Sequence, residues 1–164
     1  MCACDELIRL VRKQARVLRH RANLFHRMQT GIEEGDTEKI RNACQQMGKL
    51  EKEHSELSRN VLRALRRACV ARNISGNSAT LGRLLEEVNG ELEKQLAGAR
   101  RDLAGAIATA RRAADSVRRL ASLAAEWNSH VLDAIFRSVP AGQTYSSSGE
   151  MDSGEGRLLQ GLWG

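Results

Sequence analysis

Apolar residues recur every three or four positions along the first part of the chain. They follow the line Leu7, Ile8, Val11, Ala15, Leu18, Ala22, Phe25 and Met28. This spacing predicts an amphipathic helix over residues 4–31. The helix is expected to stop in TGIEEGDTEK, because Gly31 and Gly35 are stop signals and Asp36 can cap a new helix.

A second apolar line begins directly after that turn. It runs through Ile40, Ala43, Met47, Leu50, His54, Leu57, Val61, Ala64 and Ala68. Alternating steps of three and four are typical of a coiled-coil seam, so a helix is predicted over residues 37–73. Asn73, Gly76 and Asn77 are turn formers that end it, and Ser78 can cap the next helix. The two helices are expected to pair as an antiparallel hairpin.

The third segment, residues 79–138, contains no proline and carries two lines that each repeat every seven residues. One line is Leu96, Leu103, Ala110, Val117, Ala124 and Val131; the other is Leu85, Leu92, Ala99, Ala106, Ala113, Leu120, Trp127 and Ala134. A single helix of this length would extend roughly 90 Å. Alanines fill the middle of the seam, and Gly98 and Gly105 weaken the helix there and favour a bend.

The predicted hairpin is too short to cover the whole third helix. Part of the apolar seam of the third helix is therefore expected to be exposed, and such a stripe usually marks a surface that binds a partner. In the free chain, a homodimer could cover the same stripe. Residues 139–164, which follow Val139 and Pro140 and are rich in glycine, serine and acid, are expected to form a flexible tail. The predicted architecture is all-α: a helical domain over residues 1–138, made of a hairpin and a long third helix, and a tail.

Composition supports long helices rather than sheets. Of the 164 residues, 41% are apolar but only 3% are aromatic, and there is one proline. The sequence has no apolar run long enough to span a bilayer and no secretory signal, so a cytoplasmic protein is expected. The four cysteines lack a CxxC spacing and are interpreted as reduced thiols, with Cys2 and Cys4 at a frayed, exposed terminus.

Catalytic chemistry finds little support in the sequence. The four histidines are scattered, and neither a nucleophile motif nor a phosphate-binding loop is present. We therefore expect a protein that is not an enzyme and has no catalytic residue, metal site or cofactor. His54 is interpreted as a core or subunit-interface histidine.

The net charge of +6 makes nucleic-acid binding an alternative function, because phosphate affinity comes from lysine and arginine charges. Arginines crowd the first helix and the segment RNVLRALRRACVAR. They alternate with glutamates such as Glu33, Glu51 and Glu56, and no aromatic residue interleaves them. A solvated helical face is therefore favoured over a basic helical nucleic-acid-associated protein. A structural coiled-coil adaptor is a third alternative.

The order of these features resembles the FlgN-type flagellar export chaperones. The resemblance covers nearly the whole chain: a first helix, a Gly35-Asp36 turn in IEEGDTEKIRNACQQMGKLEKEHSEL, a Lys- and Glu-rich second helix, a long last helix, and a tail with TYSSSGEM. It implies a cytoplasmic, almost entirely helical protein that binds hook-associated proteins, the filament junction proteins. It also implies delivery of these proteins to the flagellar type III export apparatus, through its export gate or ATPase components.

The resemblance also implies two sets of functional residues. A partner's amphipathic helix is expected to cover the large apolar side chains near the end of the third helix, which are Leu120, Trp127, Val131, Ile135 and Phe136. Burial of their apolar area would supply most of the binding free energy. In chaperones of this kind a tyrosine near the end of the last helix docks on the export gate, and the resemblance implies this role for Tyr145, which is the only tyrosine of the chain.

Overall fold

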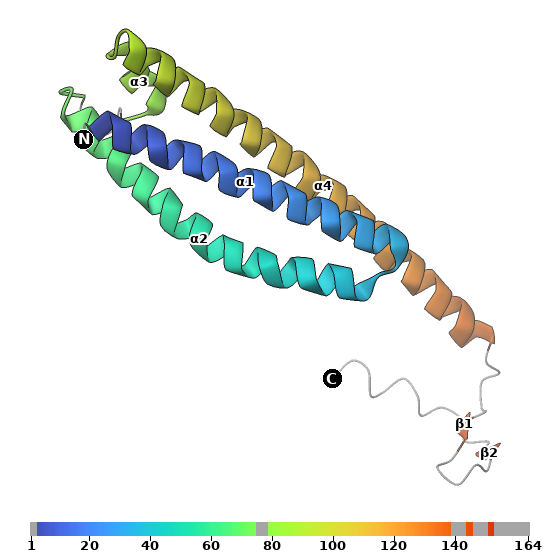
Figure 1. Cartoon of the computed structure of the whole chain (residues 1–164). Coiled ribbons are helices and arrows are strands. Elements are labelled where there is room, and N and C mark those ends of the chain that lie inside the picture. Colours follow the sequence, from blue (N-terminus) through green and yellow to red (C-terminus); the bar gives the residue numbers. More distant parts are fainter. Residues whose placement is uncertain (1–2, 75–78, 139–143, 146–150, 153–164) are drawn as a thin grey trace. The chain divides into compact units, whose positions relative to one another are not determined.

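The computed structural model describes residues 3–74, 79–138, 144–145 and 151–152. The chain divides into two compact units, residues 1–121 and 122–164. The elements in chain order are α1 (Ala3–Glu34), α2 (Thr37–Val70), α3 (Leu81–Glu86), α4 (Glu91–Ser138), β1 (Thr144–Tyr145) and β2 (Met151–Asp152). Helices account for nearly all of the described residues (Figure 1), which confirms the predicted all-α class.

A tight turn joins α1 to α2. Gly35 there has a φ of +67°, a left-handed conformation that favours glycine. The Asp36 side chain then accepts a hydrogen bond of 2.8 Å from the backbone N–H of Lys39, which caps α2. Gly31 does not stop α1 as predicted, since the helix continues to Glu34. Gly31 instead allows close approach of α2, because a Cβ atom there would lie 2.8 Å from Ile40 Cγ1.

The first two helices form the predicted antiparallel hairpin, which Figure 1 shows as two neighbouring ribbons running in opposite directions. Polar contacts between the two helices show the antiparallel direction, because residues later in α1 contact residues earlier in α2. Arg67 Nη1 lies 3.4 Å from Glu6 Oε2, and Arg27 Nη1 donates to Gln46 Oε1 at 3.2 Å. Exposed pairs contribute at most about 1 kcal/mol each, so apolar burial between the helices is the main source of stability. The buried apolar residues between the two helices are Val17, Leu24, Leu50 and Leu57.

The prediction of a single helix over residues 79–138 is wrong, because this segment forms two helices. The short α3 ends at Glu86 and α4 begins at Glu91. Gly90, between them, has a φ of +73°, which a residue with a Cβ rarely adopts. Thr80 caps α3 by accepting a hydrogen bond from the N–H of Arg83. Beyond this break, α4 passes through Gly98 and Gly105 without interruption.

Within the first unit, α4 runs parallel to α1. Arg19 of α1 lies 3.8 Å from Asp102, and Gln29, further along α1, accepts a 3.2 Å hydrogen bond from Ser116, further along α4. The apolar contact between the two helices is made mainly of small side chains, which allow the backbones to approach closely. The buried set is Ala15, Leu18, Ala22, Ala106, Ala110 and Ala113.

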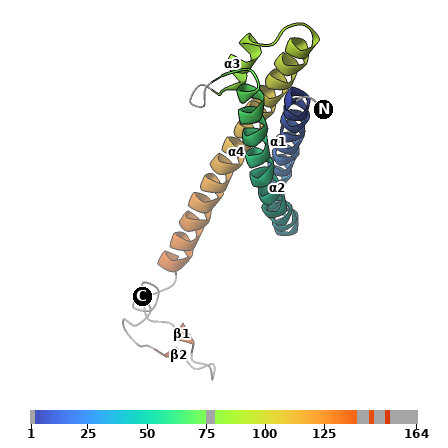
Figure 2. The same cartoon turned by 90° about the vertical axis from the view of Figure 1, so that its left-hand side faces the viewer.

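The largest apolar cluster lies where all four helices meet, at the end of the first unit at which α1 begins (Figures 1 and 2). Leu7, Leu84 and Leu96 are fully buried there. Cys4 is buried in the same cluster, so the expectation of an exposed terminus is wrong for this residue, while Cys2 lies outside the described residues. Cys69 also packs there, and burial raises the pKa of its thiol.

The second unit contains the last part of α4 and the pair formed by β1 and β2. The two strands are antiparallel, with Thr144 opposite Asp152 and Tyr145 opposite Met151. This pair was not predicted from the sequence. Most of the predicted flexible tail, residues 139–143, 146–150 and 153–164, lies outside the described residues.

Candidate partner-binding surfaces

The last turns of α4 expose large apolar side chains. The side chains of Trp127 and Phe136 are 71% and 70% exposed. Val131 and Ile135 are also exposed, whereas Leu120 is half-buried. Leu123 and Leu132, which were not predicted from the sequence, belong to the same exposed set. We call this surface the α4 stripe, which consists of Leu123, Trp127, Val131, Leu132, Ile135 and Phe136.

Charged residues occupy the other side of this helix segment. At 3.6 residues per turn, the α4 stripe covers one broad face, while Glu126 and Asp133 project from the opposite face. Ser122 also lies on that polar side, and its side chain is exposed. This segregation of faces is typical of a helix that binds another apolar surface.

Tyr145 lies in β1, where its backbone is paired with Met151. Its side chain is outside what the structure describes. The role of Tyr145 in docking on the export gate therefore stays a prediction, as does the choice of the five partner-binding residues.

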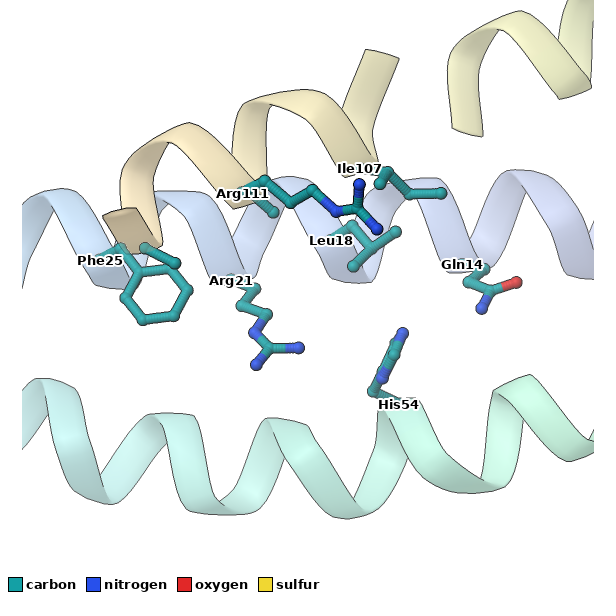
Figure 3. A pocket seen from close by; sticks show the side chains of 9 residues that line it. Gln14, Leu18, Arg21, Phe25, His54, Ile107 and Arg111 are labelled. Atoms are coloured by element: carbon teal, nitrogen blue, oxygen red, sulfur yellow. The ribbon is translucent and has the colours of Figure 1, made fainter. Parts of the chain in front are cut away.

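A second surface lies in the first unit, in a pocket of about 410 Å³ between α1, α2 and α4. Figure 3 shows Arg21 of α1 and His54 of α2 pointing toward each other across the space between their helices. Ile107 and Arg111 of α4 lie on the other side, over Leu18 of α1. The other lining residues are Gln14, Phe25, Ala110 and Ala114.

Polar contacts fix the walls of this pocket. Arg21 forms an ion pair with Glu51 of α2, with 2.6 Å between Nη2 and Oε1, and its guanidinium carbon lies 5.7 Å from the centre of the Phe25 ring. Gln14 donates a 3.0 Å hydrogen bond to Ser58 of α2. None of the described lining residues is acidic. The pocket thus combines an apolar floor with a basic border.

One face of α4 extends this basic border beyond the pocket. Ile107 and Arg111 belong to a row with steps of four and three, which consists of Arg100, Ala104, Ile107, Arg111, Ala114 and Arg118. Arg100, Arg111 and Arg118 carry the charge of this face, and none of the three forms an ion pair with another described residue. We call this row the α4 arginine row.

The sequence did not predict this pocket. His54 was interpreted as a core or subunit-interface histidine; it is half-buried and lines the pocket, so it does not belong to the core, and the subunit-interface interpretation stays a prediction. Each lining residue falls on an ordinary helical repeat, and the sequence does not indicate which repeats of different helices become neighbours. The α4 arginine row could have been found, because its spacing places three arginines on one helix face.

Other kinds of site receive no support within the described part of the chain. Residues 3–74 and 79–138 contain no group of three His, Cys, Asp or Glu side chains placed to hold a metal ion. Among the described residues, no helix combines the length and the apolar character that crossing a membrane requires.

Comparison with known proteins identifies a family. The family model described as FlgN protein matches residues 1–153 of the chain. The search of curated proteins and the search of solved structures gave no match.

Proposed function

Because the chain belongs to the FlgN family of flagellar export chaperones, we propose that it binds hook-associated proteins in the cytoplasm and delivers them to the flagellar type III export apparatus. The observation that supports this proposal is the α4 stripe. An exposed surface with this many large apolar side chains on one helix is typical of a site that a partner covers.

The proposed mechanism is burial of a partner helix against the α4 stripe. An aromatic side chain such as Trp127 or Phe136 brings about 150–250 Å² to a contact, and apolar area contributes about 25 cal/mol per Å². Because about 70% of each side chain is still exposed, each supplies roughly 2–4 kcal/mol before the cost of ordering is subtracted. A terminal helix of a hook-associated protein, covered in this way, would be kept from premature assembly. Leu120, Val131 and Ile135 extend the proposed contact.

Co-expression with hook-associated proteins tests this proposal. A stable 1:1 complex is expected on gel filtration, and Trp127→Asp or Val131→Asp should abolish it, because a carboxylate would be buried in an apolar contact. Ser122→Asp is the matched control, since it adds the same charge to the polar side of the same helix segment. The proposal fails if no hook-associated protein forms a complex, or if Ser122→Asp is as damaging as Trp127→Asp.

Delivery to the export apparatus is a separate part of the proposal and involves Tyr145. Tyr145→Ala should leave the complex with the hook-associated protein intact but lower the amount of that protein exported by cells. Unchanged export would remove the docking role from Tyr145 and leave the substrate-binding role of α4 untouched.

A further inference from the structure

The pocket over α1 has the form of a helix-binding groove. Its floor is α1, and its walls are α2 on one side and α4 on the other. A volume of about 410 Å³ is enough for several apolar side chains but not for a whole helix, whose diameter with side chains is about 10 Å. A helix would therefore lie over the opening and insert side chains between Phe25 and Ile107.

The α4 wall is longer than the pocket itself. From Arg100 to Arg118, the α4 arginine row extends over about five helical turns, or about 27 Å. Ile107, which is 37% exposed, lies near its middle. A surface of this length suits an extended helical ligand that runs along α4 better than it suits a small molecule.

The charges of the groove select the kind of helix. Arg111 faces the pocket from α4 and has no ion-pair partner among the described residues, and Arg100 and Arg118 continue that wall. Glu51 is nearby, but it is already paired with Arg21. A ligand with carboxylates beside its apolar face would neutralise the three arginines, whereas a basic helix would be repelled.

We propose that this groove binds an acidic amphipathic helix of a partner protein and that it acts as a docking surface separate from the α4 stripe. The apolar face of that helix covers Phe25 and Ile107, and its carboxylates pair with the α4 arginine row. Binding of this helix in the groove does not depend on which protein covers the α4 stripe.

The test uses a fluorescently labelled helical peptide of about 18 residues, long enough to span the arginine row. It carries leucines at alternating steps of three and four, with glutamates beside them, and a matched peptide has lysines in place of the glutamates. Binding is measured by fluorescence anisotropy to the full chain with Trp127→Asp, so that the α4 stripe does not compete. The acidic peptide should bind at least about tenfold more tightly than the basic one, with an affinity that falls as salt is added.

Two neighbouring arginines provide a matched pair of variants. Arg111→Glu should weaken binding of the acidic peptide about tenfold, because it replaces attraction with repulsion. Arg112→Glu changes the same charge on a side chain that points away from the row, and it should change the affinity by less than about twofold. Circular dichroism confirms that both variants keep their helices.

Equal binding of the acidic and basic peptides, or equal loss in the two arginine variants, would overturn the proposal. So would a photoreactive acidic peptide that cross-links outside the groove walls. If the chain alone forms dimers that Arg111→Glu disrupts, the groove binds a second copy of the chain instead. If the peptide binds only after residues 139–164 are removed, the groove binds the chain's own C-terminal segment instead. Failure here leaves the complex with hook-associated proteins unaffected, because that complex is tested through Trp127 and Val131.

Discussion

The two halves of α4, one in the first unit and one in the second, share the same seven-residue apolar repeat but differ in the size of the apolar side chains. In the half inside the first unit, one face packs against the other helices, and apart from Leu96 the buried residues of that face are alanines such as Ala99 and Ala106. The last turns expose large apolar side chains such as Trp127 and Phe136. A helix that served only the folding of its own chain would place its largest apolar residues where they are buried. The large side chains at the end of α4 are therefore best explained by a contact with another molecule.

The strongest test of this comparison truncates one leucine in each half. Leu96 is fully buried in the cluster where the four helices meet, so Leu96→Ala should lower the free energy of unfolding by about 2–5 kcal/mol. Leu123 is 60% exposed, and Leu123→Ala should change it by no more than about 0.5 kcal/mol. Urea denaturation followed by circular dichroism measures both. Similar losses in the two variants would mean that the halves do not differ in their contribution to folding.

A smaller effect is expected from enlarging the alanine contact between α1 and α4. Ala106 is buried against α1, so Ala106→Leu should destabilise the chain by about 1–3 kcal/mol through overpacking. Ala108, two residues away, is exposed, and Ala108→Leu should be nearly neutral because leucine is also a good helix former. Thermal unfolding of the two variants distinguishes the sites. A neutral Ala106→Leu would show that the contact has room for larger side chains.

The smallest expected effect concerns the glycines of the covered half. A Cβ atom added at Gly98 or Gly105 would meet nothing within 4 Å, so Gly98→Ala and Gly105→Ala should each stabilise the chain by about 0.5–1 kcal/mol. Gly31→Ala is the contrasting variant, because Ile40 must move to accept its Cβ atom. A higher midpoint in urea is expected for the first two variants and not for Gly31→Ala. Loss of stability at Gly98 or Gly105 would indicate a close contact at that position.

Much of the fold can be predicted from apolar spacing. The lines through α1 and α2 predicted both helices and their antiparallel pairing, because each leaves one continuous apolar face to bury. The break between α3 and α4 was missed because the seven-residue line from Leu85 to Leu92 runs straight across it. The dipeptide Asn89-Gly90 was the available signal, since it is a turn former that supplies the required positive φ.

The surfaces were harder to predict than the helices. Large apolar side chains at the end of a long helix were visible in the sequence, and the structure exposes Trp127, Val131, Ile135 and Phe136. Whether these residues contact a hook-associated protein stays a prediction. The groove depends on which turns of α1, α2 and α4 become neighbours, and a periodicity within one helix contains no such information. Cys4 shows the same limit on a smaller scale, because its burial depends on the helices that surround α1.

The exposure of the α4 stripe has an evolutionary consequence. Mutations at buried positions such as Leu96 are constrained by folding, whereas mutations at Trp127 or Phe136 leave the packed core unchanged. The last turns of α4 can therefore diverge together with a partner's helix while the rest of the molecule is retained. One helix thus combines a segment under selection for stability with a segment on which new binding specificity can arise.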